Sequence, residues 1–140
     1  FGRELSNTFF VDRIPGYEWL EGYGVIYSID TYSSFVRGRD YIFPTQGQKT
    51  VDATGRQELV ESLYPKFRED MVNFVLDYGR TLRSLPDNEK LHLKIKITEC
   101  KGCKVPDYLE IVADISDLRK FDQQKISREK MRDALDIEEI

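Results

Sequence analysis

The chain has 140 residues, 40% of them hydrophobic, and includes eight Tyr, eight Phe and one Trp. This is enough apolar material for one domain spanning residues 1–140. The net charge is −4, and no more than two basic residues stand together, which excludes the electrostatic surface of a nucleic-acid-binding protein. Apolar runs fall far short of the roughly 18 residues that cross a bilayer, so we expect no membrane span.

The first predicted strand covers residues 23–30. Its larger side chains recur at every second position: Tyr23, Val25, Tyr27 and Ile29. This period of two places all four on one face of a strand. The following residues, 33–53, are polar and interrupted by glycine and proline, which predicts a mobile loop region.

A long helix is predicted next, ending before Pro86. Apolar residues at spacings of three and four form one stripe: Val60, Tyr64, Phe67, Met71, Phe74, Tyr78 and Leu82. Such a stripe is typical of a helix packed on a core. Pro65 lacks a backbone donor and predicts a kink or a break. Gly79 indicates close packing of the backbone there.

Two further strands are predicted at 90–98 and 108–115. Alternating apolar residues are Leu91, Leu93, Ile95 and Ile97 in the first, and Leu109, Ile111, Ala113 and Ile115 in the second. The strands should pair as a hairpin with both apolar sets on one face. We expect Ile97 opposite Leu109 and His92 opposite Asp114, which makes the outer face a charge-paired, solvated one.

Two short helices are predicted in the C-terminal part, at 116–121 and 127–135, and Ser127 caps the second. We expect the last residues of the chain to fray. The expected fold is therefore α+β. A small, mainly antiparallel sheet, with strands near 23–30, 90–98 and 108–115, carries the long helix on its apolar face. The C-terminal helices close its edge.

Cys100 and Cys103 are the only cysteines and lie at the tip of the predicted hairpin. A C-x-x-C pair can form a structural disulfide, a redox dithiol or half of a zinc site. No helix begins here to lower a thiol pKa. His92 is eight residues away along a strand, too far to share a metal ion. We favour a local disulfide or unpaired thiols, with redox activity and a metal shared between two chains as alternatives.

Other catalytic patterns are missing from the sequence. The chain has one histidine, no Gly-rich phosphate loop and no nucleophile elbow. The expected pair of His92 and Asp114 lacks a nucleophile and a pocket, which favours simple charge pairing. We therefore assign no catalytic residue, no metal site and no cofactor.

Three short stretches resemble an uncharacterised group of exported bacterial proteins. They are Tyr23-Gly-Val-Ile-Tyr27, Asp77-Tyr-Gly-Arg-Thr-Leu-Arg-Ser-Leu-Pro86 and Ile115-Ser-Asp-Leu-Arg-Lys-Phe121. The resemblance covers about a fifth of the chain. It implies the order strand, long helix, hairpin, helix and an exported location, periplasmic or secreted. It implies no activity, and the pair of cysteines is not part of it.

The aromatic first third provides the other candidate site. The side chains that could present a stacking surface to a ligand or partner are Tyr17, Trp19, Tyr23 and Tyr27. Packing in an ordinary core is the more common role of such residues, and the binding surface is the functional alternative. The sequence thus predicts a non-enzymatic binding or assembly module for an unknown protein or small ligand. A thiol-redox or metal-binding protein using Cys100 and Cys103 is the alternative function.

Overall fold

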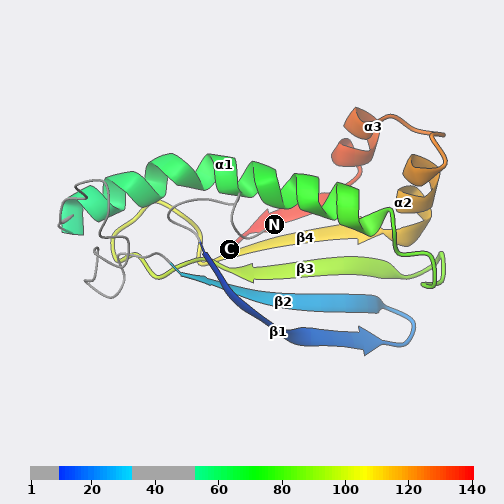
Figure 1. Ribbon diagram of the computed structural model, residues 1–140, viewed down its shortest axis with the longest axis horizontal. Helices are drawn as coiled ribbons and strands as arrows, with labels where there is room; N and C mark the ends of the chain where they lie inside the picture. Colours follow the sequence, from blue (N-terminus) through cyan, green and yellow to red (C-terminus); the bar gives the residue numbers. More distant parts are fainter. Residues whose placement is uncertain (1–9, 33–52) are drawn as a thin grey trace, which may run out of the picture.

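The computed structural model describes residues 10–32 and 53–140 and has an α+β architecture (Figure 1). Its elements are β1 (Phe10–Leu20), β2 (Gly24–Tyr32), α1 (Ala53–Gly79), β3 (Lys90–Lys96), β4 (Tyr108–Asp114), α2 (Ile115–Asp122), α3 (Arg128–Asp133) and β5 (Asp136–Glu139). The strands form one sheet in the order β1-β2-β3-β4-β5. The predicted fold class is confirmed. The predicted loop 33–53 lies outside the described residues, except that Ala53 begins α1.

The core lies between α1 and one face of the sheet. Each apolar residue predicted for the hairpin is buried: Leu91, Leu93, Ile95, Ile97, Leu109, Ile111, Ala113 and Ile115. The intervening residues of β3 and β4 are half-buried or exposed, as the alternation requires. From the helix, Phe67 and Met71 are fully buried against this face. The strict period of two therefore determines which face receives the helix.

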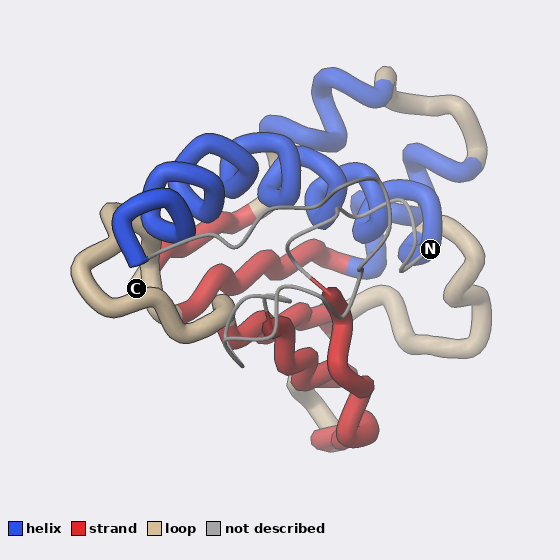
Figure 2. Tube along the Cα trace, turned by 60° about the vertical axis from the view of Figure 1, so that its left-hand side comes forward, coloured by secondary structure: helices blue, strands red, loops and turns tan. Residues whose placement is uncertain are grey.

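Strands β2 and β3 are neighbours and run parallel, whereas all other neighbours are antiparallel. Parallel strands need a crossover connection, and α1 supplies it. Figure 1 shows α1 lying along the β3 and β4 half of the sheet. In Figure 2 the β1 and β2 end projects away from the helical layer. One part of the sheet face therefore has no helix over it among the described elements.

Helix α1 continues through Pro65 without a break. Of the kink or break expected there, the break is wrong: Pro65 lies on the exposed side of an unbroken helix, while Tyr64 and Phe67 are buried. Burial of these large side chains offsets the roughly 3 kcal/mol that an internal proline costs. Neither α1 nor any other helix within residues 53–140 has the length and apolar character needed to cross a bilayer.

The buried stripe of α1 differs from the predicted one in its last two turns. Val72, Val75 and Leu76 are fully buried, whereas Phe74 is half-buried and Tyr78 is exposed. Gly79 confirms the expected close packing: a side chain there would meet Leu118 at 2.9 Å. The end of α1 therefore presents Tyr78 to Tyr27 of β2, while Phe74 packs against the margin of the core.

The hairpin of β3 and β4 has a register two residues from the expected one. Ile95 stands opposite Leu109, and His92 stands opposite Val112. A shift of two residues leaves every side chain on its predicted face, so the apolar pattern cannot distinguish the two registers. The predicted pairing of His92 with Asp114 is wrong, since Asp114 stands opposite Lys90 and binds its Nζ at 2.6 Å.

Both edge strands were unexpected. The C-terminal residues expected to fray form β5, where Ile137 stands opposite Ile111 and Glu139 accepts a hydrogen bond of 2.5 Å from the Tyr64 hydroxyl. Strand β5, not the C-terminal helices, therefore covers the free side of β4. Of those helices, α3 begins as predicted, because the Ser127 Oγ accepts a hydrogen bond from the backbone N–H of Lys130 at 3.1 Å.

Substitution of Ile95 tests this packing. Ile95→Ala should lower the free energy of unfolding by about 2–5 kcal/mol, because Ile95 is fully buried beneath α1 and its loss leaves a cavity. Urea denaturation measures the change. Lys96→Ala on the same strand is exposed and should change stability by less than about 0.5 kcal/mol. Equal effects of the two substitutions would contradict the assigned faces.

Candidate functional site

An aromatic groove lies beside the hairpin of β1 and β2. We define it by its lining residues: Tyr17, Trp19, Val25, Tyr27, Leu82, Ser84, Leu85 and Pro86. It has a volume of about 560 Å³, within the roughly 300–1,000 Å³ typical of ligand sites. Three of the four aromatic residues predicted as a binding surface line this groove.

Strand pairing brings the aromatic side chains together. Tyr17 stands opposite Tyr27, and Trp19 stands opposite Val25, so all four share one face of the hairpin. The turn between the strands contains Gly22, and β2 begins at Gly24; both glycines have a positive φ. A side chain on Gly24 would meet the Lys90 carbonyl oxygen at 1.9 Å, so only glycine allows β2 to approach β3 here.

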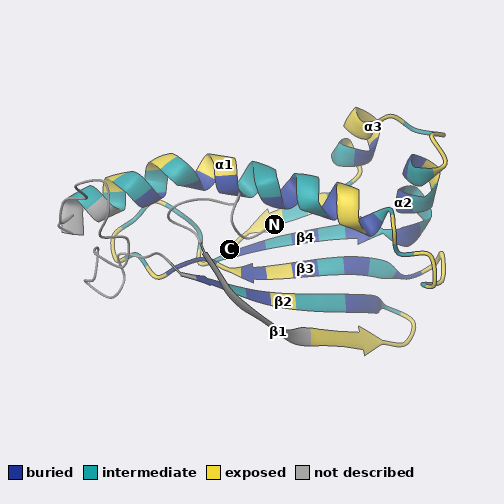
Figure 3. Cartoon of the chain, viewed as in Figure 1, coloured by how far each residue is buried: buried dark blue, intermediate teal, exposed yellow. Residues whose placement is uncertain are grey.

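Trp19 is held in place by a buried carboxylate. Its indole N–H donates a hydrogen bond of 2.9 Å to Glu89, whose second oxygen accepts from the Gly22 backbone N–H at 3.1 Å. Glu89 is only 3% exposed, whereas Trp19 is 53% exposed and Tyr17 is 67% exposed. Figure 3 shows this end of β1 coloured as exposed throughout. The indole is therefore fixed in orientation while its ring stays in contact with solvent.

A row of rings connects the groove to α1. The ring of Tyr27 lies 5.6 Å from that of Tyr17 and 6.1 Å from that of Tyr78, which stacks in turn on Phe74 at 5.3 Å. The hydroxyls of Tyr27 and Tyr78 are 3.2 Å apart. Burial, followed by this hydrogen bond, raises the pKa of Tyr27 to about 12. The Tyr27 hydroxyl, which like any tyrosine hydroxyl is uncharged near neutral pH, therefore stays uncharged to a higher pH than usual.

Tyr23, the fourth predicted aromatic residue, is not part of the groove. It belongs to the turn before β2, and its hydroxyl lies 2.7 Å from the Nδ1 atom of His92. The Nε2 atom of His92 is 2.7 Å from Glu110. The outer face of the sheet therefore carries a hydrogen-bonded row of tyrosine, histidine and carboxylate. Both hydrogen-bonding positions of the imidazole are occupied, an arrangement that fixes the ring and links the turn before β2 to β3 and β4.

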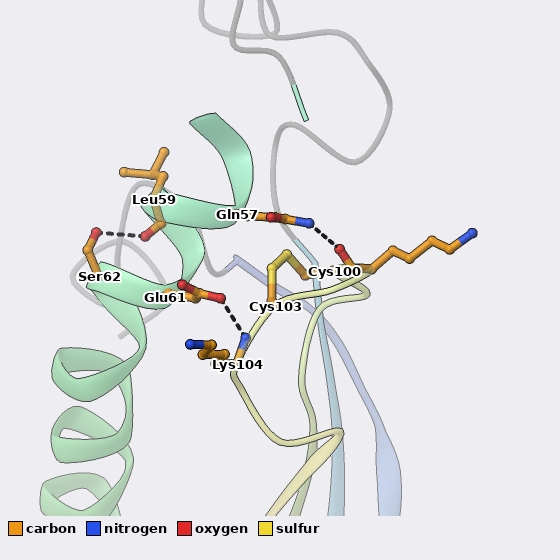
Figure 4. The surroundings of a disulfide bond; sticks show 8 residues. Gln57, Leu59, Glu61, Ser62, Cys100, Cys103 and Lys104 are labelled. Atoms are coloured by element: carbon orange, nitrogen blue, oxygen red, sulfur yellow. Dashed lines mark hydrogen bonds between the residues drawn. A yellow bond between two sulfur atoms is a disulfide. The ribbon is translucent and has the colours of Figure 1, made fainter. Parts of the chain in front are cut away.

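The cysteines lie where the sequence placed them, in the loop between β3 and β4, and form a disulfide with their Cα atoms 5.4 Å apart. The loop is bound to the first turns of α1 (Figure 4). Gln57 donates a hydrogen bond of 2.6 Å to the Lys101 carbonyl, and Glu61 accepts one of 2.6 Å from the Lys104 backbone N–H. The disulfide therefore closes a turn that is held against the helix on both sides.

A second hollow follows the disulfide loop. It has a volume of about 760 Å³ and is lined by residues of the segments 96–103 and 105–108. Cys100 and Cys103 are half-buried in its wall. Across residues 10–32 and 53–140, no cluster of three or more His, Cys, Asp or Glu side chains is arranged to hold a metal ion. The chemistry that this loop can offer is thiol-disulfide exchange.

Sequence reasoning missed the residues that build the groove around its predicted aromatics. Glu89 gave no signal because an acidic residue before a strand is normally solvated. The helical spacing predicts Tyr78 in the core stripe, not at a binding surface. The wall formed by residues 82–86 has no pattern of its own, because it follows the helix as an irregular segment.

Glu89→Gln tests the support beneath the groove. An amide offers one oxygen to the two N–H groups of Trp19 and Gly22, so the free energy of unfolding should fall by about 1–3 kcal/mol. Because Trp19 is the only tryptophan, a change in fluorescence emission reports on this site alone. Glu21→Gln in the same turn is exposed and serves as the control. Unchanged stability and emission in Glu89→Gln would show that Glu89 does not hold the indole.

The outer-face row yields a second prediction. His92→Ala removes the shared partner of Tyr23 and Glu110 and should cost about 1–3 kcal/mol of unfolding free energy. Asp114→Ala removes an exposed pair with Lys90 and should cost at most about 1 kcal/mol. Denaturation of both variants in parallel measures the difference. If Asp114→Ala proved the more damaging, the row would have no structural role.

No protein-family model, curated protein or solved structure matches this chain. The resemblance to exported bacterial proteins therefore stays a prediction from short motifs. What the protein does is inferred from the geometry of its own surface.

Proposed function

We propose that this protein is a non-enzymatic binding module whose aromatic groove takes up apolar side chains of a partner polypeptide. One observation carries the proposal: Trp19 is more than half exposed although a buried carboxylate fixes its orientation. A ring that served only the core would be covered. A ring that is held rigidly in solvent can instead be buried by a partner when the partner binds.

The energetics of interfaces support this function. Tryptophan and tyrosine dominate binding hot spots because they bury a large area at a small cost in side-chain entropy. Here the indole N–H is already bonded to Glu89, so binding has little further ordering of Trp19 to impose. Leu85 and Pro86 provide an apolar wall opposite the rings. The groove thus offers a rigid, largely apolar surface before any partner arrives.

A polypeptide fits the groove better than a small molecule does. Small-molecule sites usually enclose about 70–90% of the ligand surface. In this groove Tyr17 is 67% exposed, so one wall is formed by a side chain that is open to solvent. An extended chain can cover such a wall along its length, whereas a compact ligand would leave it uncovered.

Selection of peptides tests the proposal. Random decapeptides displayed on phage should yield sequences that bind the wild-type protein and lose about 30-fold or more in affinity for Trp19→Ala, the loss of about 2 kcal/mol expected at a hot spot. Ile140→Ala is the matched control, because Ile140 is a similarly exposed apolar residue that neither lines the groove nor belongs to β1. Recovery of only peptides that bind Trp19→Ala equally well would refute the function, and so would small apolar ligands that bind when peptides do not.

Thiol-disulfide exchange is the second candidate function. It is favoured by the position of the half-buried disulfide in the wall of a hollow. In such a reaction an external dithiol gives up two hydrogens and becomes a disulfide, while Cys100 and Cys103 gain them as thiols. A disulfide also persists best in an oxidising compartment, which supports the exported location that the resemblance implies.

Replacement of both cysteines by serine separates the two functions. We expect Cys100→Ser with Cys103→Ser to leave peptide binding unchanged, because the loop does not line the aromatic groove. The loss of stability should stay below the roughly 3 kcal/mol expected for a 15-residue loop, since this disulfide closes a much shorter one. Thermal unfolding and an insulin-reduction assay provide the measurements. An exchange activity of the wild type that disappears in this variant would instead establish the second function.

A further inference from the structure

We propose that the partner segment binds as an additional antiparallel strand on the outer edge of β1, along residues 17–20, and that it carries a basic residue opposite Glu18. The inference rests on the proposed function and names the class of partner. It predicts an extended segment in which apolar side chains flank a lysine or arginine. Main-chain hydrogen bonds to β1 and side-chain contacts in the aromatic groove would act together.

The hydrogen bonds around the turn fix which backbone groups of β1 point outward. The Leu20 carbonyl accepts from the Tyr23 N–H at 2.9 Å, and the Tyr23 carbonyl accepts from the Lys90 N–H at 2.8 Å. Leu20 therefore faces β2 with its backbone, and the alternation of an antiparallel ladder makes Glu18 do the same. The backbone N–H and C=O groups of Tyr17 and Trp19 consequently point away from the sheet.

Only this part of β1 is open to pairing. Within the part of the chain that the structure describes, β1 is the first strand of the sheet and has β2 as its only neighbour. Its earlier half is irregular, with register shifts between Val11 and Arg13 and between Arg13 and Gly16, and it contains Pro15, which lacks an N–H. Bulges and proline are the usual protection of an edge strand. Residues 17–20 have neither, and all four are exposed.

The negative charge of Glu18, at the centre of this edge, indicates whether the bound strand comes from a second copy of the chain or from a different protein. If two copies paired edge to edge with Tyr17 opposite Trp19, Glu18 would stand directly opposite Glu18 of the second copy. Like charges in that position are destabilising. The edge also has no basic residue between positions 14 and 22, while Glu21 adds a second exposed carboxylate. A basic side chain is the complement of this edge.

The alternation of a strand then determines the rest of the segment. A residue opposite Glu18 points to the outer face, so its two neighbours point to the groove face, beside Tyr17 and Trp19. Apolar residues at these two positions would cover the exposed rings. Each would also form a hydrogen-bonded pair with Tyr17 or Trp19, exchanging both backbone bonds.

The test uses a blocked peptide, acetyl-Thr-Thr-Val-Lys-Val-Thr-Thr-amide, titrated against the intact protein while Trp19 fluorescence is recorded. We expect saturable binding that slows hydrogen exchange at the amides of Tyr17 and Trp19, which point outward, and not at that of Glu18. N-methylation of both valines removes two donors but keeps their side chains, and it should weaken binding about tenfold or more. A peptide with glutamate in place of lysine should bind weakly to the wild type and regain affinity for Glu18→Lys.

The outcomes separate this inference from the function on which it rests. If the N-methylated peptide bound equally well and still required Trp19, the groove would bind peptides without strand pairing, and the inference would be wrong while the function stood. The same holds if selected peptides need Trp19 but lack the basic residue. Self-association of the wild type that blocked the peptide would also overturn the inference in favour of a second copy. If no peptide bound in a way that depends on Trp19, the proposed function itself would be wrong.

Discussion

The candidate site depends on the two hydrogen bonds that the Glu89 carboxylate accepts. This carboxylate lies between the turn of the β1 and β2 hairpin and the start of β3, and both of its oxygens accept hydrogen bonds from the hairpin. Its backbone is equally engaged: the N–H donates to the Pro86 carbonyl, and the carbonyl accepts from Ile115 at the start of α2. One residue thus ties the groove wall, the hairpin and the first C-terminal helix together. Without such a partner, a buried carboxylate would be strongly unfavourable.

Much of the fold could be predicted because its central strands obey a strict pattern. The alternation in β3 and β4 identified both strands, their buried faces and the helix-bearing side of the sheet. It could not identify the register, since any even shift preserves the faces. Three of the four aromatic residues of the predicted surface meet in the groove because the β1–β2 register places Tyr17 opposite Tyr27 and Trp19 opposite Val25, a pairing that the sequence pattern alone does not specify.

The remaining elements escaped prediction because their signals were weak or misleading. Strand β1 contains Pro15 and Gly16, residues that normally end strands, and the structure accommodates them with register shifts. Strand β5 has one partly buried apolar residue, Ile137, among acidic neighbours. It exists because β4 offers a free edge, a property of the assembled sheet and not of the local sequence. The support that Glu89 gives to Trp19 joins residues 70 positions apart, and no local pattern encodes such a contact.

The parallel contact between β2 and β3 has a consequence for the order in which the protein assembles. The β3–β4 connection is 11 residues long, so these strands can pair early, whereas 57 residues, including all of α1, separate β2 from β3. The aromatic hairpin should therefore dock last and open first, while the rest of the sheet remains folded. Native-state hydrogen exchange would detect this as a separate, less stable unit. A partner strand bound to β1 would then stabilise the docked β1–β2 hairpin, which is the last part of the molecule to fold.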